Sequence, residues 1–147
     1  MRSARLWREL RDAASLLPDP ARLIWRLSVP PAAGAPVVAE IIHPPRSGAG
    51  QGGGRAVNAP AEHYFDWGGG LIWLALPASD DSSAALVRAA VARHGGHATL
   101  LRAPTAMRLA VPVFEPQPAP LAALARRVKA AFDPRRILNP GRMAADL

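Results

Sequence analysis

The sequence predicts an α+β domain in which helices pack on an antiparallel sheet with the element order βαββαβ. Strand-like and helix-like stretches alternate in that order along the middle of the chain, and short glycine- or proline-containing turns separate them. These stretches are residues 23–29, 63–67, 71–76, 84–93 and 97–103. Residues 35–42, between the first two strands, are apolar and fit either a short helix or a strand. A helix there completes the split βαββαβ arrangement.

The first twenty residues read as a helix that leads into the domain proper, residues 21–147. Apolar side chains recur at helical spacing over residues 4–17, with charged side chains elsewhere around the helix. Pro18 and Pro20 end it. This segment is either the connection from another domain or an amphipathic helix that packs on this one.

The first strand of the domain, residues 23–29, places neighbouring side chains on opposite faces of the sheet. Trp25 is therefore expected in the core. Arg26 then faces either solvent or an interface between domains.

Residues 43–60 are rich in proline, glycine, serine and arginine, which predicts an exposed loop. Within it, Gly48 to Gly53 match the spacing G-x-G-x-x-G. In dinucleotide-binding proteins that motif follows a strand and opens a helix, whose N-terminus receives the pyrophosphate. Residues 55–60 start no convincing helix, so we interpret the motif as part of the loop.

The next two strands, joined by Gly68, Gly69 and Gly70, form a predicted hairpin. Trp67 and Trp73 are expected in the core or as cross-strand partners. Asp66 is expected to accept hydrogen bonds from amides of the glycine turn, with a catalytic role as the alternative, because a buried carboxylate requires partners.

After the helix at 84–93, Gly95 and Gly96 end the helical pattern before the last strand. Residues 108–114 are expected to be extended. A final helix follows, and one of its faces carries Leu121, Leu124, Val128, Ala131 and Phe132.

The C-terminal stretch, residues 128–143, is the most specific part of the sequence. Asp133 is suited to cap a new turn that Pro134 begins. Pro140 and Gly141 suit the two central positions of a type II turn, with Asn139 as its first residue. Either this segment docks its apolar residues Phe132, Ile137 and Leu138 into a core, or its rigid turn presents Asn139, Gly141 and Arg142 to a ligand.

Composition excludes several classes of function. The 147 residues contain no cysteine, which excludes disulfides, iron–sulfur ligation and thiol catalysis within this chain. The net charge of +7 is spread over scattered arginines and does not form a basic stripe with interleaved aromatics, so nucleic-acid binding is not expected. The four histidines lack metal-ligand spacing, and no metal site is expected. No apolar run is long enough for a membrane span and no signal peptide is visible, which predicts a cytoplasmic protein.

The tail, Phe-Asp-Pro-x-x-Ile-Leu-Asn-Pro-Gly-Arg-Met over residues 132–143, resembles the C-terminal signature of FAD-linked oxidases of the vanillyl-alcohol-oxidase type. That group includes subunits of glycolate oxidase and D-lactate dehydrogenase. Three further stretches resemble the FAD-binding subunits of glycolate oxidases: residues 25–30, residues 66–70 with Trp73, and residues 95–103. Together the matching stretches are spread over about three quarters of the chain.

The resemblance implies a ferredoxin-like C-terminal domain that covers a flavin, with FAD as cofactor and oxidation of a 2-hydroxy acid such as glycolate to glyoxylate as the reaction. The implied partners are the flavin and iron–sulfur subunits of such an oxidase, through which any membrane contact would be made. The FAD-binding domain of the family has no counterpart in these residues, so we expect a portion of a subunit that is inactive alone. The alternative is a non-catalytic module for subunit interaction.

The resemblance also suggests which residues meet the flavin or substrate. Arg142 is expected to stabilise an anion there, and Asn139 and Gly141 to be its hydrogen-bonding neighbours. His97 is a weaker candidate, since a structural role is the alternative. No residue is identified as a catalytic acid or base.

Overall fold

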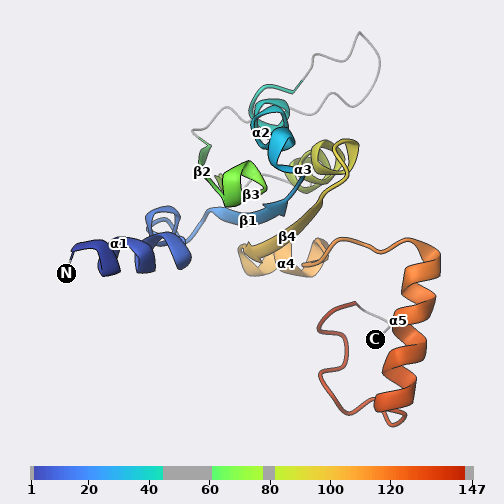
Figure 1. Ribbon diagram of the computed structural model, residues 1–147. Helices are drawn as coiled ribbons and strands as arrows, with labels where there is room; N and C mark the ends of the chain where they lie inside the picture. Colours follow the sequence, from blue (N-terminus) through green and yellow to red (C-terminus); the bar gives the residue numbers. More distant parts are fainter. Residues whose placement is uncertain (1, 45–60, 78–81, 145–147) are drawn as a thin grey trace.

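The computed structural model describes residues 2–44, 61–77 and 82–144 (Figure 1). The elements in chain order are α1 (Arg2–Arg11), η1 (Ala14–Leu16), β1 (Leu23–Ser28), η2 (Pro31–Ala33), α2 (Gly34–Ile42), β2 (Glu62–Asp66), η3 (Trp67–Gly69), β3 (Leu71–Leu76), α3 (Ser82–Arg93), β4 (His97–Arg102), α4 (Thr105–Ala110) and α5 (Ala119–Phe132). The expected loop at 43–60, with its glycine motif, lies almost entirely outside the described residues.

The four strands form one antiparallel sheet in the order β2-β3-β1-β4. This order, with α2 between β1 and β2 and α3 between β3 and β4, is the split βαββαβ arrangement and confirms the predicted fold class. The ambiguous stretch at 35–42 is helical, because Val37 and Ile41 lie four residues apart and are both fully buried against the sheet.

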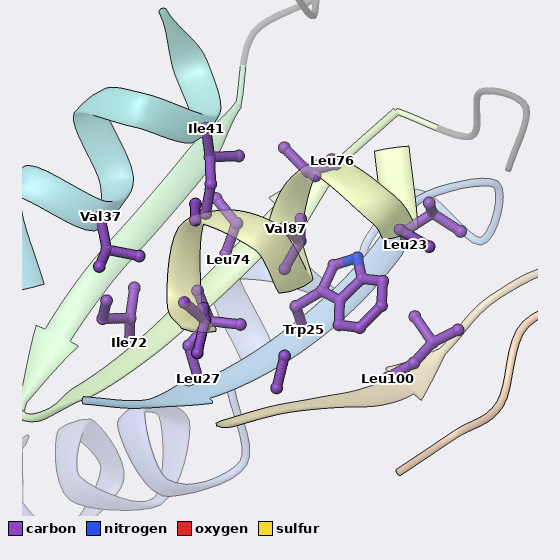
Figure 2. Packing of buried hydrophobic residues seen from close by; sticks show 14 of the residues in the cluster. Leu23, Trp25, Leu27, Val37, Ile41, Ile72, Leu74, Leu76, Val87 and Leu100 are labelled. Carbon is purple, nitrogen blue, oxygen red and sulfur yellow. The ribbon is translucent and has the colours of Figure 1, made fainter. Parts of the chain in front are cut away.

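The main core lies between the sheet and the helices α2 and α3 (Figure 2). Trp25 is fully buried there, as the alternation along β1 predicts, with Leu23 and Leu27 on the same side. The guanidinium of Arg88 lies 5.8 Å from the centre of the Trp25 ring, a cation–π contact that extends across the edge of the core.

The opposite face of the sheet is only partly covered. Leu16 of η1 packs on Ile24 and Ala75, with Tyr64 and Trp73 at the border of this small cluster. The predicted helix at 4–17 is in fact two pieces, because Ala13 adopts a left-handed φ of 51° between them. Ala13 and Leu16 are buried, while Leu6 of the first piece remains 53% exposed. The first piece contacts the sheet at its end, where the Leu10 carbonyl accepts from the Tyr64 hydroxyl at 2.6 Å.

The outer edge of β4 is covered by the segment that follows α4. The Leu100 amide donates to the Val113 carbonyl at 2.9 Å, and the Ala98 amide donates to the Glu115 carboxylate at 3.2 Å. The expectation of an extended stretch at 108–114 was therefore half wrong: α4 continues to Ala110, and only the residues after it are extended. Met107 packs against the core from this short helix.

The helix α5 and the C-terminal segment form an arm that lies away from the sheet (Figure 1). We use the term "C-terminal arm" for residues 116–144. All of its large apolar side chains are exposed, and Phe132 is exposed by 84%. The arm therefore presents an apolar helix face that the described residues leave uncovered.

Candidate functional site

The C-terminal arm is closed by a single buried carboxylate. Asp133, only 4% exposed, accepts from Lys129 Nζ at 2.6 Å and from the amides of Ile137 and Leu138 at 3.0 and 2.9 Å. Lys129 Nζ also donates to the Leu138 carbonyl. The Lys129 ammonium, and after it the Leu138 and Ile137 amides, lower the pKa of Asp133 to about 2.

Asp133 accepts backbone amides, as the predicted cap requires, but these amides lie further along the chain than in an ordinary helix cap. A helix cap accepts amides two or three residues further on, whereas Asp133 accepts those four and five residues further on. Residues after Pro134 therefore form a loop that folds back toward the end of α5, with the Arg136 amide donating to the Asp133 carbonyl.

The predicted turn at Asn139 is confirmed. The Arg142 amide donates to the Asn139 carbonyl at 3.3 Å, and Gly141 has a φ of 69°, which a type II turn requires at that position. Asn139 itself has a positive φ of 46°, a conformation that asparagine tolerates better than most residues. The backbone of the turn thus fixes where the Arg142 side chain begins.

A groove of about 710 Å³ runs between α5 and the turn. Its polar lining includes Asn139, Arg142 and Lys129. Its apolar walls include Leu121, Leu124, Val128, Phe132, Leu138 and Met143. The structure therefore brings two of the predicted site residues, Asn139 and Arg142, into one groove, with Gly141 shaping the turn behind them.

This arrangement contradicts the reading of the tail as a segment docked into a core. Phe132, Ile137 and Leu138 are exposed by 84%, 71% and 57%. Their side chains pack on no core formed by the described residues. The loop after Asp133 is held on the end of α5 by the Asp133 hydrogen bonds instead.

His97 lies elsewhere, at the start of β4, where it is exposed and is not among the groove residues. Its cross-strand neighbour is Ser28, and the neighbour of Ser28 on the other side is Leu71. These residues lie on the sheet face opposite the main core, because they alternate along their strands with members of the main cluster. The predicted site residues are thus divided between the arm and this face.

Two residues of the same face were not predicted as site residues. The Arg26 guanidinium lies 5.8 Å from the centre of the Trp67 ring. Trp67 was expected in the core or paired with Trp73, but it is 66% exposed, and the cross-strand partner of Trp73 is Tyr64, whose ring stacks on it. Asp66 accepts the Trp67 amide at 2.7 Å, close to the capping role expected for it.

Within residues 2–44, 61–77 and 82–144, no three histidine, aspartate or glutamate side chains are grouped so that they could hold a metal ion. None of the helices in this part of the chain has the length and apolar character needed to cross a membrane.

Comparison with known proteins connects the arm to a family. Residues 116–143 match the family described as FAD linked oxidases, C-terminal domain. The whole chain is similar to glycolate oxidase subunit GlcE of Escherichia coli (strain K12), with 30% identity over 145 residues, which are 99% of this chain and 33% of that protein. The chain thus spans about a third of the length of this relative. No solved structure matches. Both matches confirm the resemblance that the tail and the three internal stretches indicated.

Proposed function

We propose that this chain is the C-terminal portion of a glycolate oxidase FAD-binding subunit and takes part in flavin-dependent oxidation of a 2-hydroxy acid, glycolate to glyoxylate. The observation that carries the proposal is a coincidence of two findings. Residues 116–143, which match the FAD linked oxidases, are also the residues that form the groove with Asn139 and Arg142.

The residues of the groove fit a flavin-bearing partner surface. Its walls are mostly apolar, and its lining also includes Arg142 and Asn139; together these suit a planar heterocycle with polar edges. FAD, when bound, supplies the acceptor for the hydride that leaves the carbon bearing the hydroxyl group. Arg142 is assigned to stabilise negative charge at the edge of the groove, because a guanidinium is always charged and donates along several directions.

Asn139 and Gly141 support Arg142 in different ways. Asn139 is one of the residues that line the groove, and its side chain is assigned to hydrogen-bond the same polar edge. Gly141 permits the turn, since its φ of 69° would strain most residues with a Cβ atom.

The occupant we assign to the groove is the FAD-bearing remainder of the same subunit. The chain covers 33% of GlcE, so most of such a subunit lies outside the compared residues. The exposed apolar face of α5 lies in the stretch that matches the family, and burial against that remainder would remove it from water. We therefore expect the isolated chain to bind FAD weakly, and a stoichiometric flavin spectrum of the purified chain would contradict this.

A chimera tests the proposal. The part of E. coli GlcE that aligns with this chain is replaced by the chain, and the chimera is produced in cells that lack GlcE but supply the other subunits. We expect bound flavin and glycolate-dependent dye reduction. The variant Arg142→Ala is expected to lower turnover at least tenfold, whereas Arg135→Ala, an exposed arginine of the same arm, leaves it unchanged.

Two results would contradict the proposal or its assignment. A soluble chimera that assembles with its partner subunits but neither holds flavin nor oxidises glycolate would favour the alternative, a non-catalytic module for subunit interaction. The same exposed apolar face of α5 is the observation that favours this alternative. Normal flavin content and turnover in the Arg142→Ala chimera would remove Arg142 from the site.

A further inference from the structure

The sheet face opposite the main core is arranged in three rows of cross-strand neighbours. The row beside the η3 turn consists of Asp66, Leu71, Ser28 and His97. The middle row consists of Tyr64, Trp73, Arg26 and Thr99. The third row consists of Glu62, Ala75, Ile24 and Arg102. Leu16 covers the third row and borders part of the middle row. Outside this cluster Leu71 is buried, whereas Arg26 and Ser28 are half-buried and His97 is exposed.

Among the described residues, Arg26 is an arginine of this face without a carboxylate partner. It lies on the central strand and is half-buried. Other arginines of the sheet and its helices are paired: Arg22 with Glu62 at 2.7 Å, and Arg93 with Glu40 at 2.6 Å. Arg102 donates to the carbonyls of Leu17 and Asp19. Across the described residues Arg26 has no carboxylate partner; its contact is with the Trp67 ring.

Trp67 forms a fixed wall beside Arg26. Its φ of 51° is unfavourable for a bulky residue, so the surrounding structure must hold it. The turn is packed so closely on residues 31–34 that a Cβ atom on Gly34 would lie 2.4 Å from the Gly69 carbonyl oxygen. The Asp66 carboxylate holds the Trp67 amide. An exposed aromatic ring kept in a strained conformation by its neighbours is typical of a binding site.

The surroundings of Arg26 suit a small anion. Ser28 and Thr99 carry hydroxyl groups that can donate, and His97 carries an imidazole. Asp66 is the carboxylate of the neighbouring row, but it accepts the Trp67 amide and forms no ion pair with Arg26. Glu62 is paired with Arg22. The positive charge of Arg26 is therefore not neutralised by the acidic residues of its own face.

We propose that Arg26, with Trp67 as a wall and the hydroxyl groups of Ser28 and Thr99 beside it, binds the carboxylate group of a small organic acid on the uncovered face of the sheet. The guanidinium matches a carboxylate with two parallel hydrogen bonds. That the acid is a 2-hydroxy acid rests on the proposed function. The carboxylate site itself rests on Arg26 and its surroundings.

The test uses the purified chain and the fluorescence of Trp67. Oxalate and glycolate are titrated at constant ionic strength, with sodium chloride as the reference and inorganic phosphate as a competing anion. We expect a saturable change in emission with oxalate and with glycolate. The change is absent in Trp67→Phe, which retains the other tryptophans.

Variants then assign the site. Arg26→Gln is expected to weaken oxalate binding about 10- to 100-fold, as for the loss of a hydrogen bond to a charged group. Arg26→Lys keeps the charge but loses the planar guanidinium that gives two parallel hydrogen bonds, and is expected to weaken oxalate binding to an intermediate extent. Arg108→Gln, which removes an equal charge from an exposed position on α4, leaves binding unchanged. Thermal unfolding of each variant reports whether the fold is retained.

The outcomes separate this site from the proposed function. No saturable change with oxalate, equal binding by folded Arg26→Gln, or tighter binding of phosphate than of oxalate would overturn the carboxylate site. If the GlcE chimera oxidises glycolate while any of these results holds, the function stands and the site is wrong. If oxalate binding depends on Arg26 while the chimera is inactive, the site stands and the function is wrong.

Discussion

Asp133 determines how the C-terminal loop is held against α5. A carboxylate with three donors and 4% exposure replaces the hydrophobic docking that usually orders a C-terminal segment. The sequence around Asp133 predicts a cap, because aspartate followed by proline is typical of one. The part played by Lys129 could not be predicted, since it depends on how far the loop folds back over the end of α5.

The pH dependence of the arm follows from this carboxylate. The pKa of Asp133 is lowered to about 2 from an ordinary 3.8, so its stabilising contribution is complete above about pH 4 and is lost as the pH falls toward 2. We expect the amide resonances of Ile137 and Leu138 to titrate in that window by NMR. The variant Asp133→Asn should show faster hydrogen exchange at both amides at pH 7. Asp12→Asn, at the exposed position just after α1, is the control, and unchanged exchange in Asp133→Asn would contradict the assignment.

Gly34 packs against the η3 turn that holds Trp67 beside Arg26. It has a helical φ of −55°, so alanine would suit its backbone and would ordinarily be favourable by up to about 1 kcal/mol. The added Cβ atom would lie 2.4 Å from the Gly69 carbonyl oxygen, and the resulting overpacking is expected to cost about 1–3 kcal/mol. Urea unfolding measures the difference.

Gly68→Ala is the matched control for Gly34→Ala. Gly68 has a φ of 62° and no atom near the position of an added Cβ, so only backbone strain of about 1 kcal/mol is expected. A Gly34→Ala variant as stable as the parent would show that the turn is not closely packed.

Elements were predicted where periodicity is strong. The alternation along β1 and the hairpin around the three glycines placed the central strands correctly, and the helical spacing placed the apolar face of α5 correctly. The helix α4 was missed because Thr105–Ala110 is too short for a periodic signal. It forms because Pro104 precedes it and Met107 packs on the core. Trp67 was misplaced because the strand ends one residue earlier than the aromatic pattern suggests.

At the level of α5, its apolar face should matter for assembly and not for the stability of the isolated chain. Leu124 is 52% exposed within that face, so Leu124→Glu is expected to change the free energy of unfolding by less than about 0.5 kcal/mol. In the GlcE chimera the same change should greatly reduce flavin content, because it places a charge in the groove. Ala123→Glu, on another side of the helix, is the control. A chimera that keeps its flavin with Leu124→Glu would exclude the groove as the contact with the flavin-bearing part.

The whole molecule divides into a folded body and the C-terminal arm. The main cluster of buried apolar residues is drawn from residues 23–111, and apart from Asp133 the arm adds no buried side chain. The element order and the sheet could be predicted because each strand is separately marked by the sequence. The position of the arm could not, because its apolar face gives no indication of which surface covers it.

Truncation tests this division. A chain that ends at Gln117 keeps Glu115 and its hydrogen bond to β4, and its melting temperature is expected to lie within a few degrees of that of the full chain. Trp25→Ala, by contrast, empties the centre of the core and is expected to cost about 3–5 kcal/mol. Differential scanning calorimetry compares the three proteins. A large loss of stability on truncation would show that the arm belongs to the body.

The central strand β1 has a consequence for how substitutions in this protein would be recorded in a genetic screen. Trp25 lies in the core and Arg26 on the opposite face of the sheet. Substitutions at residue 25 would therefore affect folding, whereas substitutions at residue 26 would affect the proposed binding. A screen that scores the amount of protein in cells would find intolerance at residues 23, 25 and 27, and at Ile24, which is buried under Leu16. A screen that scores growth through the proposed oxidation of glycolate would add residues 26 and 28, and the difference between the two maps would mark alternate residues of β1.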